Sequence, residues 1–444
     1  MSAASPPLLF GLERRHWLVL VAAALGWGFD VFDALLFNYV APNCIPTLLG
    51  LEIGSPAAKA AIVRWNGVLT ALLLVGWAAG GVIFGQVADR IGRVRALMLT
   101  ILLYASGTAA CALAPNLGVL IVFRALASLG IGGEWAAGAT LVAESLPEDK
   151  RVTAAAFMQT ASPCGLFLAM FVNYQVAGVW LADQPSISWR YVFLCGLLPA
   201  LAVFILRFAA LEPDQRAARM APRPAGRLSE LFQPAQRRAT WSGFALAVVA
   251  LITWWSFNAF LPVIASGLAF EHAAQMRVTG AAAVVLAEQW KLQATLAFNL
   301  GGLIGALVTA PIAQRFGRRG VFAAYFCVAG LGILASYGLP LDPLTVLRAS
   351  FVVGLAAFGV FGAFVFYLPE LFPKHLRATG AGFTYNMGRV IAAGGPFLVG
   401  WVAAQGPNAT RGAMGLVFYI GFVPLLALAL IPFIPETRGR RFEA

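Results

Sequence analysis

Long hydrophobic runs separated by short polar breaks dominate the chain. Six runs lie in the first half, at residues 17–40, 62–87, 95–114, 117–145, 152–180 and 189–209. Six more follow, at residues 239–269, 291–313, 320–340, 343–371, 378–403 and 411–434. Each is long enough to cross the hydrocarbon core of a bilayer, which needs about 20 residues of helix. The pattern therefore predicts an all-α membrane protein with twelve transmembrane helices.

The second half of the chain repeats short motifs of the first. Gly85-Gln-Val-Ala-Asp89-Arg90-Ile-Gly92-Arg93 returns in degraded form as Ala310-Pro-Ile-Ala-Gln314-Arg315-Phe-Gly317-Arg318, and the central glycines are 225 positions apart. Glu144-Ser-Leu-Pro147 returns as Glu370-Leu-Phe-Pro373, with its prolines 226 apart. A nearly constant offset indicates a duplicated half, which is the usual architecture of a secondary transporter.

We therefore expect two pseudo-symmetric six-helix bundles. The first covers residues 1–209 and the second covers residues 239–444. Residues 210–238 form the longest polar stretch, which we interpret as a cytoplasmic linker with one short helix around Leu228–Phe232.

Composition and charge agree with a protein that faces lipid. Hydrophobic residues make up 60% of the chain and charged residues only 11%, too few to cover a soluble protein of 444 residues. The net charge of +12 invites a nucleic-acid interpretation. However, 22 of the 31 Lys and Arg residues fall on one predicted side, and only six, Lys291 among them, in the opposite loops. The positive-inside rule then places both termini in the cytoplasm. We expect a multi-pass monomer of the cell inner (plasma) membrane that binds no nucleic acid.

Four stretches of the chain resemble those of a known family. Gly85-x-x-x-Asp89-Arg90-x-Gly92-Arg93 resembles the signature loop of the major facilitator superfamily, and Pro435-Glu436-Thr437-Arg438-Gly439 resembles the motif that closes its metabolite porters. The stretches Gly130-Ile-Gly132-Gly133-Glu134-Trp135 and 367–389 are similar to bacterial symporters of protons with aromatic acids, sialate or monocarboxylates. The resemblance implies the major facilitator fold. It also implies proton-coupled import of a small organic acid by alternating access.

Proton coupling is expected at acidic residues of the first and fourth segments. Asp30 and Asp33 are three residues apart, so they share a helix face. A charged Asp at the bilayer centre costs about 2.5–3.5 kcal/mol, and two close carboxylates favour retention of a proton. The structural alternative is that they pair with Arg124 or Arg389. Arg124 and Glu134 are about 15 Å apart along their helix, so each needs another partner. We expect Arg124 in the proton relay, at the substrate or in an ion pair, and Glu134 in the relay or a structural role.

Substrate binding is expected on the eleventh segment, where Tyr385, Asn386 and Arg389 share a helix face. A guanidinium in a dry, aromatic-lined cavity suits bidentate capture of a carboxylate. We expect Arg389 near the membrane midplane, facing the first or the seventh helix.

A stacking wall for the substrate is expected on the seventh segment. Trp254 and Trp255 provide two indoles there, and Asn258 adds a hydrogen-bonding amide one turn later. Lipid contact or simple helix packing is the alternative interpretation of the two tryptophans.

Five charged residues cluster at the predicted cytoplasmic helix ends: Asp89, Arg90, Arg93, Glu144 and Arg151. The family resemblance implies that they form an interhelical network that latches the outward-open state. The alternative is charge that only sets topology, but an acidic residue such as Asp89 contributes nothing to topology.

The chain offers no sign of catalytic chemistry. It has no Ser/His/Asp set, no cluster with metal-ligand spacing and no phosphate-binding loop. We expect no enzyme activity, no cofactor and no metal, and only a small carboxylate, protons and lipid as partners. Two alternatives to import stay open: an efflux antiporter of a small metabolite or drug, and a non-transporting membrane sensor of a metabolite. A linker of about 30 residues without a recognisable domain argues against the sensor.

Overall fold

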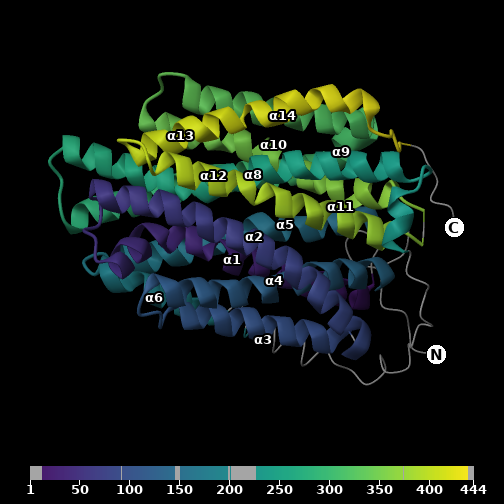
Figure 1. The fold of residues 1–444 in the computed structure, drawn as a ribbon, viewed down its shortest axis with the longest axis horizontal. Helices are drawn as coiled ribbons and strands as arrows, with labels where there is room; N and C mark the ends of the chain where they lie inside the picture. Colours follow the sequence, from purple (N-terminus) through teal and green to yellow (C-terminus); the bar gives the residue numbers. More distant parts are fainter. Residues whose placement is uncertain are drawn as a thin grey trace.

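Long helices lie side by side along one axis of the molecule (Figure 1). The computed structural model describes residues 13–91, 93–145, 151–198, 201, 227–373 and 375–438. The first half contains α1 (Arg14–Leu49), α2 (Pro56–Ile91), α3 (Arg93–Cys111), α4 (Leu117–Ser145), α5 (Arg151–Asn173), the π-helical η3 (Tyr174–Trp180) and α6 (Pro185–Cys195).

The second half begins with a short 3-10 helix, η5 (Leu228–Phe232), where the sequence predicted a short helix. It continues with α8 (Arg237–Gln275), α9 (Ala281–Gly338), α10 (Pro343–Glu370), α11 (Arg377–Ala392), α12 (Gly394–Ala403), α13 (Ala409–Ile420), α14 (Phe422–Leu426) and the 3-10 helix η6 (Ala427–Phe433).

The 58 residues of α9 are two helices joined at Gly317. Gly317 has φ 77° and ψ 178°, a backbone conformation that glycine adopts without the penalty of a Cβ atom. The chain bends there, which agrees with the break between the predicted segments 291–313 and 320–340.

Seven helical segments of the described chain are long and apolar enough to cross a membrane, judged by length and composition. Among the described residues there is no strand. These observations confirm the all-α membrane class. The number of twelve crossings stays a prediction, because residues 202–226 lie outside the described chain and some crossings would be built from consecutive short helices.

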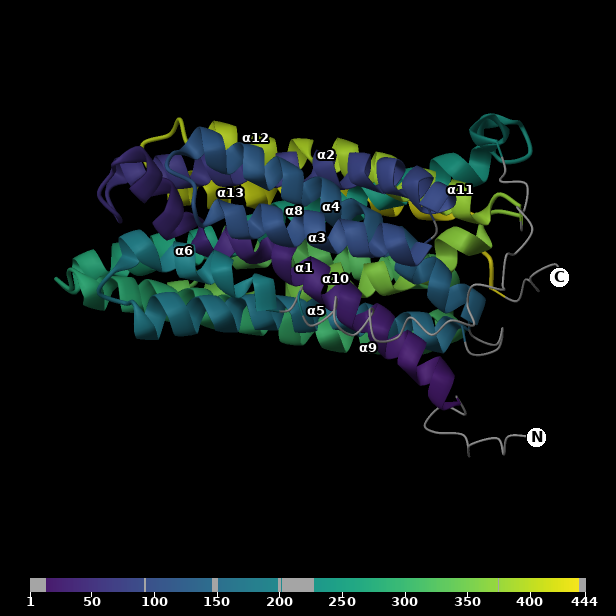
Figure 2. The ribbon, with the colours of Figure 1, turned by 90° about the horizontal axis from the view of Figure 1, so that it is seen from below.

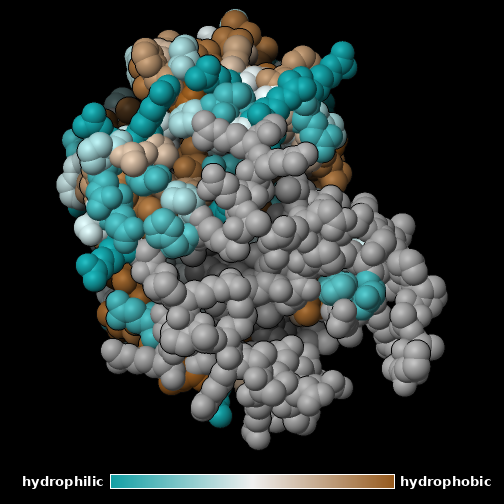
Figure 3. Space-filling view, turned by 90° about the vertical axis from the view of Figure 1, so that its right-hand side faces the viewer, coloured by the Kyte–Doolittle hydropathy of each residue, from teal (hydrophilic) through white to brown (hydrophobic). Residues whose placement is uncertain are grey.

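The beginning of α1 lies at the same end of the bundle as the C-terminal segment of the chain (Figure 2). We call this the terminal end, and the opposite end, where α1 and α8 finish, the far end. Among the side chains described at the terminal end, hydrophilic ones predominate on the surface (Figure 3). The middle of the bundle is apolar on the outside, with exposed residues such as Val82, Leu102 and Leu307.

The two halves contain the same close helix contact. A Cβ atom on Gly80 of α2 would overlap the carbonyl oxygen of Leu129 in α4. A Cβ atom on Gly305 of α9 would overlap the carbonyl oxygen of Leu355 in α10 in the same way. Gly305 follows Gly80 by 225 residues, the offset of the repeated motifs. Small residues let membrane helices approach closely, so each half uses its glycine at an equivalent crossing.

We predict that Gly305→Ala destabilises the protein, because the added methyl group meets backbone that cannot move independently. Overpacking of this kind costs about 1–3 kcal/mol. The midpoint of thermal unfolding in detergent should therefore fall. Gly415→Ala is the matched control, since a Cβ atom there has no neighbour within 4 Å. Equal unfolding midpoints for the two variants would refute the close-contact explanation.

Candidate functional site

Aromatic rings from both halves meet in the interior of the bundle. Trp77 of α2 lies 6.1 Å from Trp27 of α1 and 5.9 Å from Trp255 of α8, measured between ring centroids. Trp254 packs edge-on against Trp255 at 4.7 Å and against Phe358 of α10 at 5.4 Å. The indoles of Trp254 and Trp255 are buried, at 6% and 4% exposed, so lipid contact does not explain them. We call Trp27, Trp77, Trp254, Trp255 and Tyr385 the aromatic cluster.

Arg389 reaches into the aromatic cluster from α11. Its guanidinium carbon lies 4.4 Å from the ring centroid of Trp77 and 4.9 Å from that of Tyr385. One terminal nitrogen donates to Oδ1 of Asn386 at 3.1 Å. Tyr385, Asn386 and Arg389 therefore form one group, as their spacing predicted. The ring contact of Arg389 in the first half is Trp77 of α2, which packs in turn against Trp27 of α1 and Trp255 of α8, the first and seventh predicted segments.

The Arg389 guanidinium is only 2% exposed, and its Nε has no hydrogen-bond partner among the described residues. Its described contacts are aromatic faces, the hydroxyl of Tyr385 and one neutral amide, which leave the Nε donor on the planar edge unused. Arginine combines ring stacking with bidentate binding of carboxylates. The arrangement is chemically suited to a planar anion.

The acidic residues of α1 lie inside the first half. Asp30 is fully buried, and Asp33 is 1% exposed. Oδ2 of Asp33 accepts a hydrogen bond of 2.8 Å from Thr108 of α3. Arg124 of α4 donates to the carbonyl oxygens of Asp33 at 3.5 Å and Ala34 at 2.9 Å. Arg124 is buried and needs hydrogen-bond partners on another helix, and these partners are backbone carbonyl oxygens of α1.

Buried amides that no sequence motif indicated lie along the helices of both halves. Asn66 of α2 donates to the carbonyl oxygen of Ala259 in α8 at 2.8 Å, next to the predicted Asn258, which is 4% exposed. Nδ2 of Asn38 and both amide atoms of Asn299 lack a hydrogen-bond partner within the described chain. Buried amides without partners are costly. The sequence signal for these buried amides is an isolated Asn within an otherwise apolar segment.

A buried ion pair corrects one sequence prediction. Lys291 was assigned to a loop, but α9 begins ten residues earlier, at Ala281, and Lys291 is 1% exposed. Its Nζ lies 2.7 Å from Oε1 of Glu288. The two charges lower the hydropathy of the stretch before residue 291. The predicted segment 291–313 therefore starts ten residues after the true start of α9. The Glu-x-x-Lys spacing inside an alanine-rich stretch was the signal that indicated a helix.

The predicted cytoplasmic latch is described only in its second-half copy. The side chains of Asp89, Arg90, Arg93, Glu134, Glu144 and Arg151 lie outside the described residues. In the second half, Arg318 makes a two-pronged contact with Glu370, in which Nε lies 2.9 Å from Oε2. Thr437 also donates to this Oε2. The contact joins α9, α10 and the C-terminal segment.

Glu436 caps the helix that starts after Gly317. Its carboxylate accepts backbone hydrogen bonds of 3.0 Å from Arg318 and from Arg319. Burial alone would raise the pKa of Glu436, but hydrogen bonds from the backbone of Arg318, Arg319 and Arg438 outweigh it, so the pKa lies below its ordinary value of 4.5. An anion at a helix N-terminus is stabilised by the free N–H groups and the helix dipole.

Comparison with known proteins decides the family. A sequence profile described as the Major Facilitator Superfamily matches residues 17–396. The chain belongs to the Major Facilitator Superfamily. It is 30% identical over 436 residues to a probable 4-methylmuconolactone transporter of Cupriavidus pinatubonensis, covering 97% of this chain and 92% of the relative. It is 28% identical over 408 residues to a gentisate transporter of Corynebacterium glutamicum, covering 89% and 83% respectively.

Solved structures agree with this superfamily fold. The crystal structure of a D-xylose-proton symporter superimposes with a TM-score of 0.72 at 19% identity, over 96% of this chain and 99% of the symporter. The family match and the relatives confirm the predicted major facilitator fold. This superfamily protein is thus a multi-pass membrane transporter and not an enzyme.

We predict that Glu436→Gln lowers stability near neutral pH, because an amide cannot replace a carboxylate that accepts from two backbone N–H groups. The folded-state pKa is depressed, so the contribution of Glu436 is present above pH 4.5 and is lost as the pH falls through the folded-state pKa. The difference in unfolding midpoint between wild type and variant should therefore be largest at pH 5–7 and shrink in acid. The exposed Glu52→Gln is the control, and a difference independent of pH would contradict the capping role.

Proposed function

We propose that the protein is a proton-coupled symporter that imports a small organic acid by alternating access between its two halves. The observation that carries the proposal is the buried guanidinium of Arg389, which the second half presents to Trp77 of the first half. A cation at this depth is expensive unless an anion joins it. A substrate carboxylate is the natural anion, and it would bind where both halves contribute.

The aromatic cluster supports a substrate with a flat ring. Trp77 and Tyr385 already hold the guanidinium between aromatic faces, and Trp254 and Trp255 extend the same wall. Asn258 and the amides of Asn38, Asn66 and Asn299 are suited to hydroxyl or carbonyl groups on such a ring. The relatives named for gentisate and 4-methylmuconolactone agree with this chemistry, since both compounds combine a ring with oxygen substituents.

Coupling to protons is assigned to Asp30 and Asp33, with Arg124 and Glu134 as relay partners. Thr108 and Arg124 tie the Asp33 region of α1 to α3 and α4. Protonation of Asp33 removes the negative charge beside Arg124, which weakens the attachment of α4 to α1. Because α1 also carries Trp27 of the aromatic cluster, this change reaches the substrate site.

The internal repeat supports a cytoplasmic latch in the first half. Arg318 and Glu370 follow Arg93 and Glu144 by 225 and 226 residues. We therefore assign to Arg93 and Glu144 the contact that Arg318 makes with Glu370, with Asp89, Arg90 and Arg151 as neighbours. In this assignment the terminal end faces the cytoplasm. The protein acts as a monomer in the inner membrane, with bundles at 1–209 and 239–444 joined by the linker 210–238.

We predict that proteoliposomes containing the protein accumulate a ring carboxylate such as gentisate when an inward proton gradient is imposed. Asp30→Asn and Asp33→Asn should each reduce the accumulation ratio to 1 while sparing substrate exchange, because exchange needs no net proton transfer. Asp342→Asn is the control, since this exposed residue only caps α10. Wild-type accumulation in both variants would remove the coupling assignment, and gradient-driven efflux would favour the antiporter.

We predict that Arg389→Lys weakens binding of the acid by about 10- to 100-fold, the loss expected for a charge-assisted hydrogen bond worth about 1.5–3 kcal/mol. Lysine keeps the charge but cannot form the two-pronged contact or the same ring stacking. Arg348→Lys on the exposed side of α10 is the matched control. Isothermal titration in detergent measures both, and wild-type affinity in Arg389→Lys would refute the assignment of the carboxylate site.

A further inference from the structure

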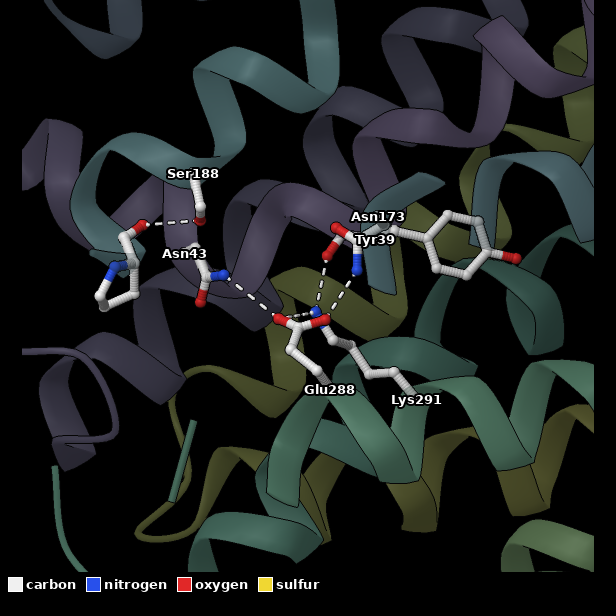
Figure 4. Close-up of polar contacts among 7 residues, drawn as sticks. Tyr39, Asn43, Asn173, Ser188, Glu288 and Lys291 are labelled. Carbon is white, nitrogen blue, oxygen red and sulfur yellow. Dashed lines mark hydrogen bonds and ion pairs between the residues drawn. The ribbon is translucent and has the colours of Figure 1, made fainter. Parts of the chain in front are cut away.

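The first turns of α9 carry a charge pair that the first half surrounds with polar groups (Figure 4). Oε1 of Glu288 accepts from Lys291 at 2.7 Å and from Nδ2 of Asn43 at 3.2 Å. Oε2 accepts from Nδ2 of Asn173 at 2.7 Å. Nζ of Lys291 also donates to the carbonyl oxygen of Tyr39 at 2.9 Å. Three of these four hydrogen bonds join the two halves of the protein.

The burial of the group is nearly complete, at 3% exposed for Asn43 and 2% for Asn173 and for Glu288. Both carboxylate oxygens are bonded by the first half, so the ion pair depends on the docked bundles for its full complement of partners. The backbones also touch closely there, because a Cβ atom on Gly178 of η3 would lie 3.0 Å from that of Glu288. A group this dry and this well bonded is held in one arrangement.

The position of the group is at the far end of the bundle. Asn43 lies six residues before the end of α1, Asn173 ends α5, and Glu288 lies seven residues after the start of α9. Other contacts between the halves reinforce closure there. A Cβ atom on Gly400 of α12 would lie 2.7 Å from the carbonyl oxygen of Val63 in α2. The guanidinium of Arg64 stacks on Trp401 of α12 at 4.2 Å.

We propose that Glu288, Lys291, Asn43 and Asn173 form the gate that closes the far end of the transporter. The inference rests on the proposed alternating access, in which the halves must separate at each end in turn. Separation breaks the three hydrogen bonds between halves but leaves the Glu288–Lys291 pair intact on one helix. When the gate opens, water reaches an ion pair whose charges still neutralise each other and two neutral amides. No unpaired charge is exposed, so the gate can close again.

The experiment measures the distance across the far end by electron spin resonance. Spin labels are attached at Glu52→Cys and Thr279→Cys, two exposed positions in different halves, after replacement of the five native cysteines. The protein is studied without substrate and without a proton gradient. Wild type should give a single short distance. Asn43→Ala with Asn173→Ala should add a longer one, because each lost hydrogen bond to a charged group shifts the equilibrium about tenfold.

Asn116→Ala is the matched control, since Asn116 at the same end only caps α4. A distance distribution unchanged by the double substitution would overturn the gate.

The exchange Glu288→Lys with Lys291→Glu gives a second test. It keeps the ion pair but brings a carboxylate toward the carbonyl oxygen of Tyr39, so the longer distance should again appear. Wild-type closure in this variant would also overturn the proposal. Neither measurement depends on transport, so failure of the gate is distinguishable from failure of the proposed symport.

Discussion

Compensation of buried charge is the constraint on which the interior of this protein depends. A charged group among apolar helices loses its hydration, and only close partners of opposite charge or several hydrogen bonds restore the lost free energy. Glu288 and Lys291 meet the requirement on one helix, and Arg318 and Glu370 meet it between two. Arg124 meets it through α1. Arg389 meets it with aromatic faces, the Tyr385 hydroxyl and one amide, all of them uncharged, and this difference supports the proposal that Arg389 binds the substrate anion.

The duplication preserved packing more faithfully than chemistry. Gly80 and Gly305 occupy equivalent helix crossings, and a larger side chain would collide with backbone at both. The ionisable residues diverged instead: the first half holds Asp30, Asp33 and Arg124 in its interior, and the second holds Arg389 and the Glu288–Lys291 pair. Steric contacts between helices are needed by both halves. Under the proposed function, a proton site and a carboxylate site are each needed once, so the two copies were free to specialise.

The sequence was most informative where a local pattern determines the outcome. Hydrophobic runs of membrane length predicted most helices, because bilayer thickness sets their length. The spacing of Tyr385, Asn386 and Arg389 predicted that they share one face of α11, because helix geometry alone decides it. Trp77 and Asn66 were not predicted as site residues, because their contacts are with the second half and form only when the two halves dock. The start of α9 was misplaced because hydropathy treats Glu288 and Lys291 as two solvated charges, whereas in the folded chain they neutralise each other.

The placement of both charges of the proposed gate on one helix has an electrical consequence. The transmembrane potential acts on each elementary charge that moves through it, by about 2.3 kcal/mol per 100 mV for a full crossing. Glu288 and Lys291 lie one helical turn apart and move as a unit, so their displacement carries no net charge through the field. If the pair forms the proposed gate, its own displacement on opening is then electrically neutral. A dependence of transport on voltage would then arise from charges outside the pair, such as Arg64 or the proposed proton and substrate anion.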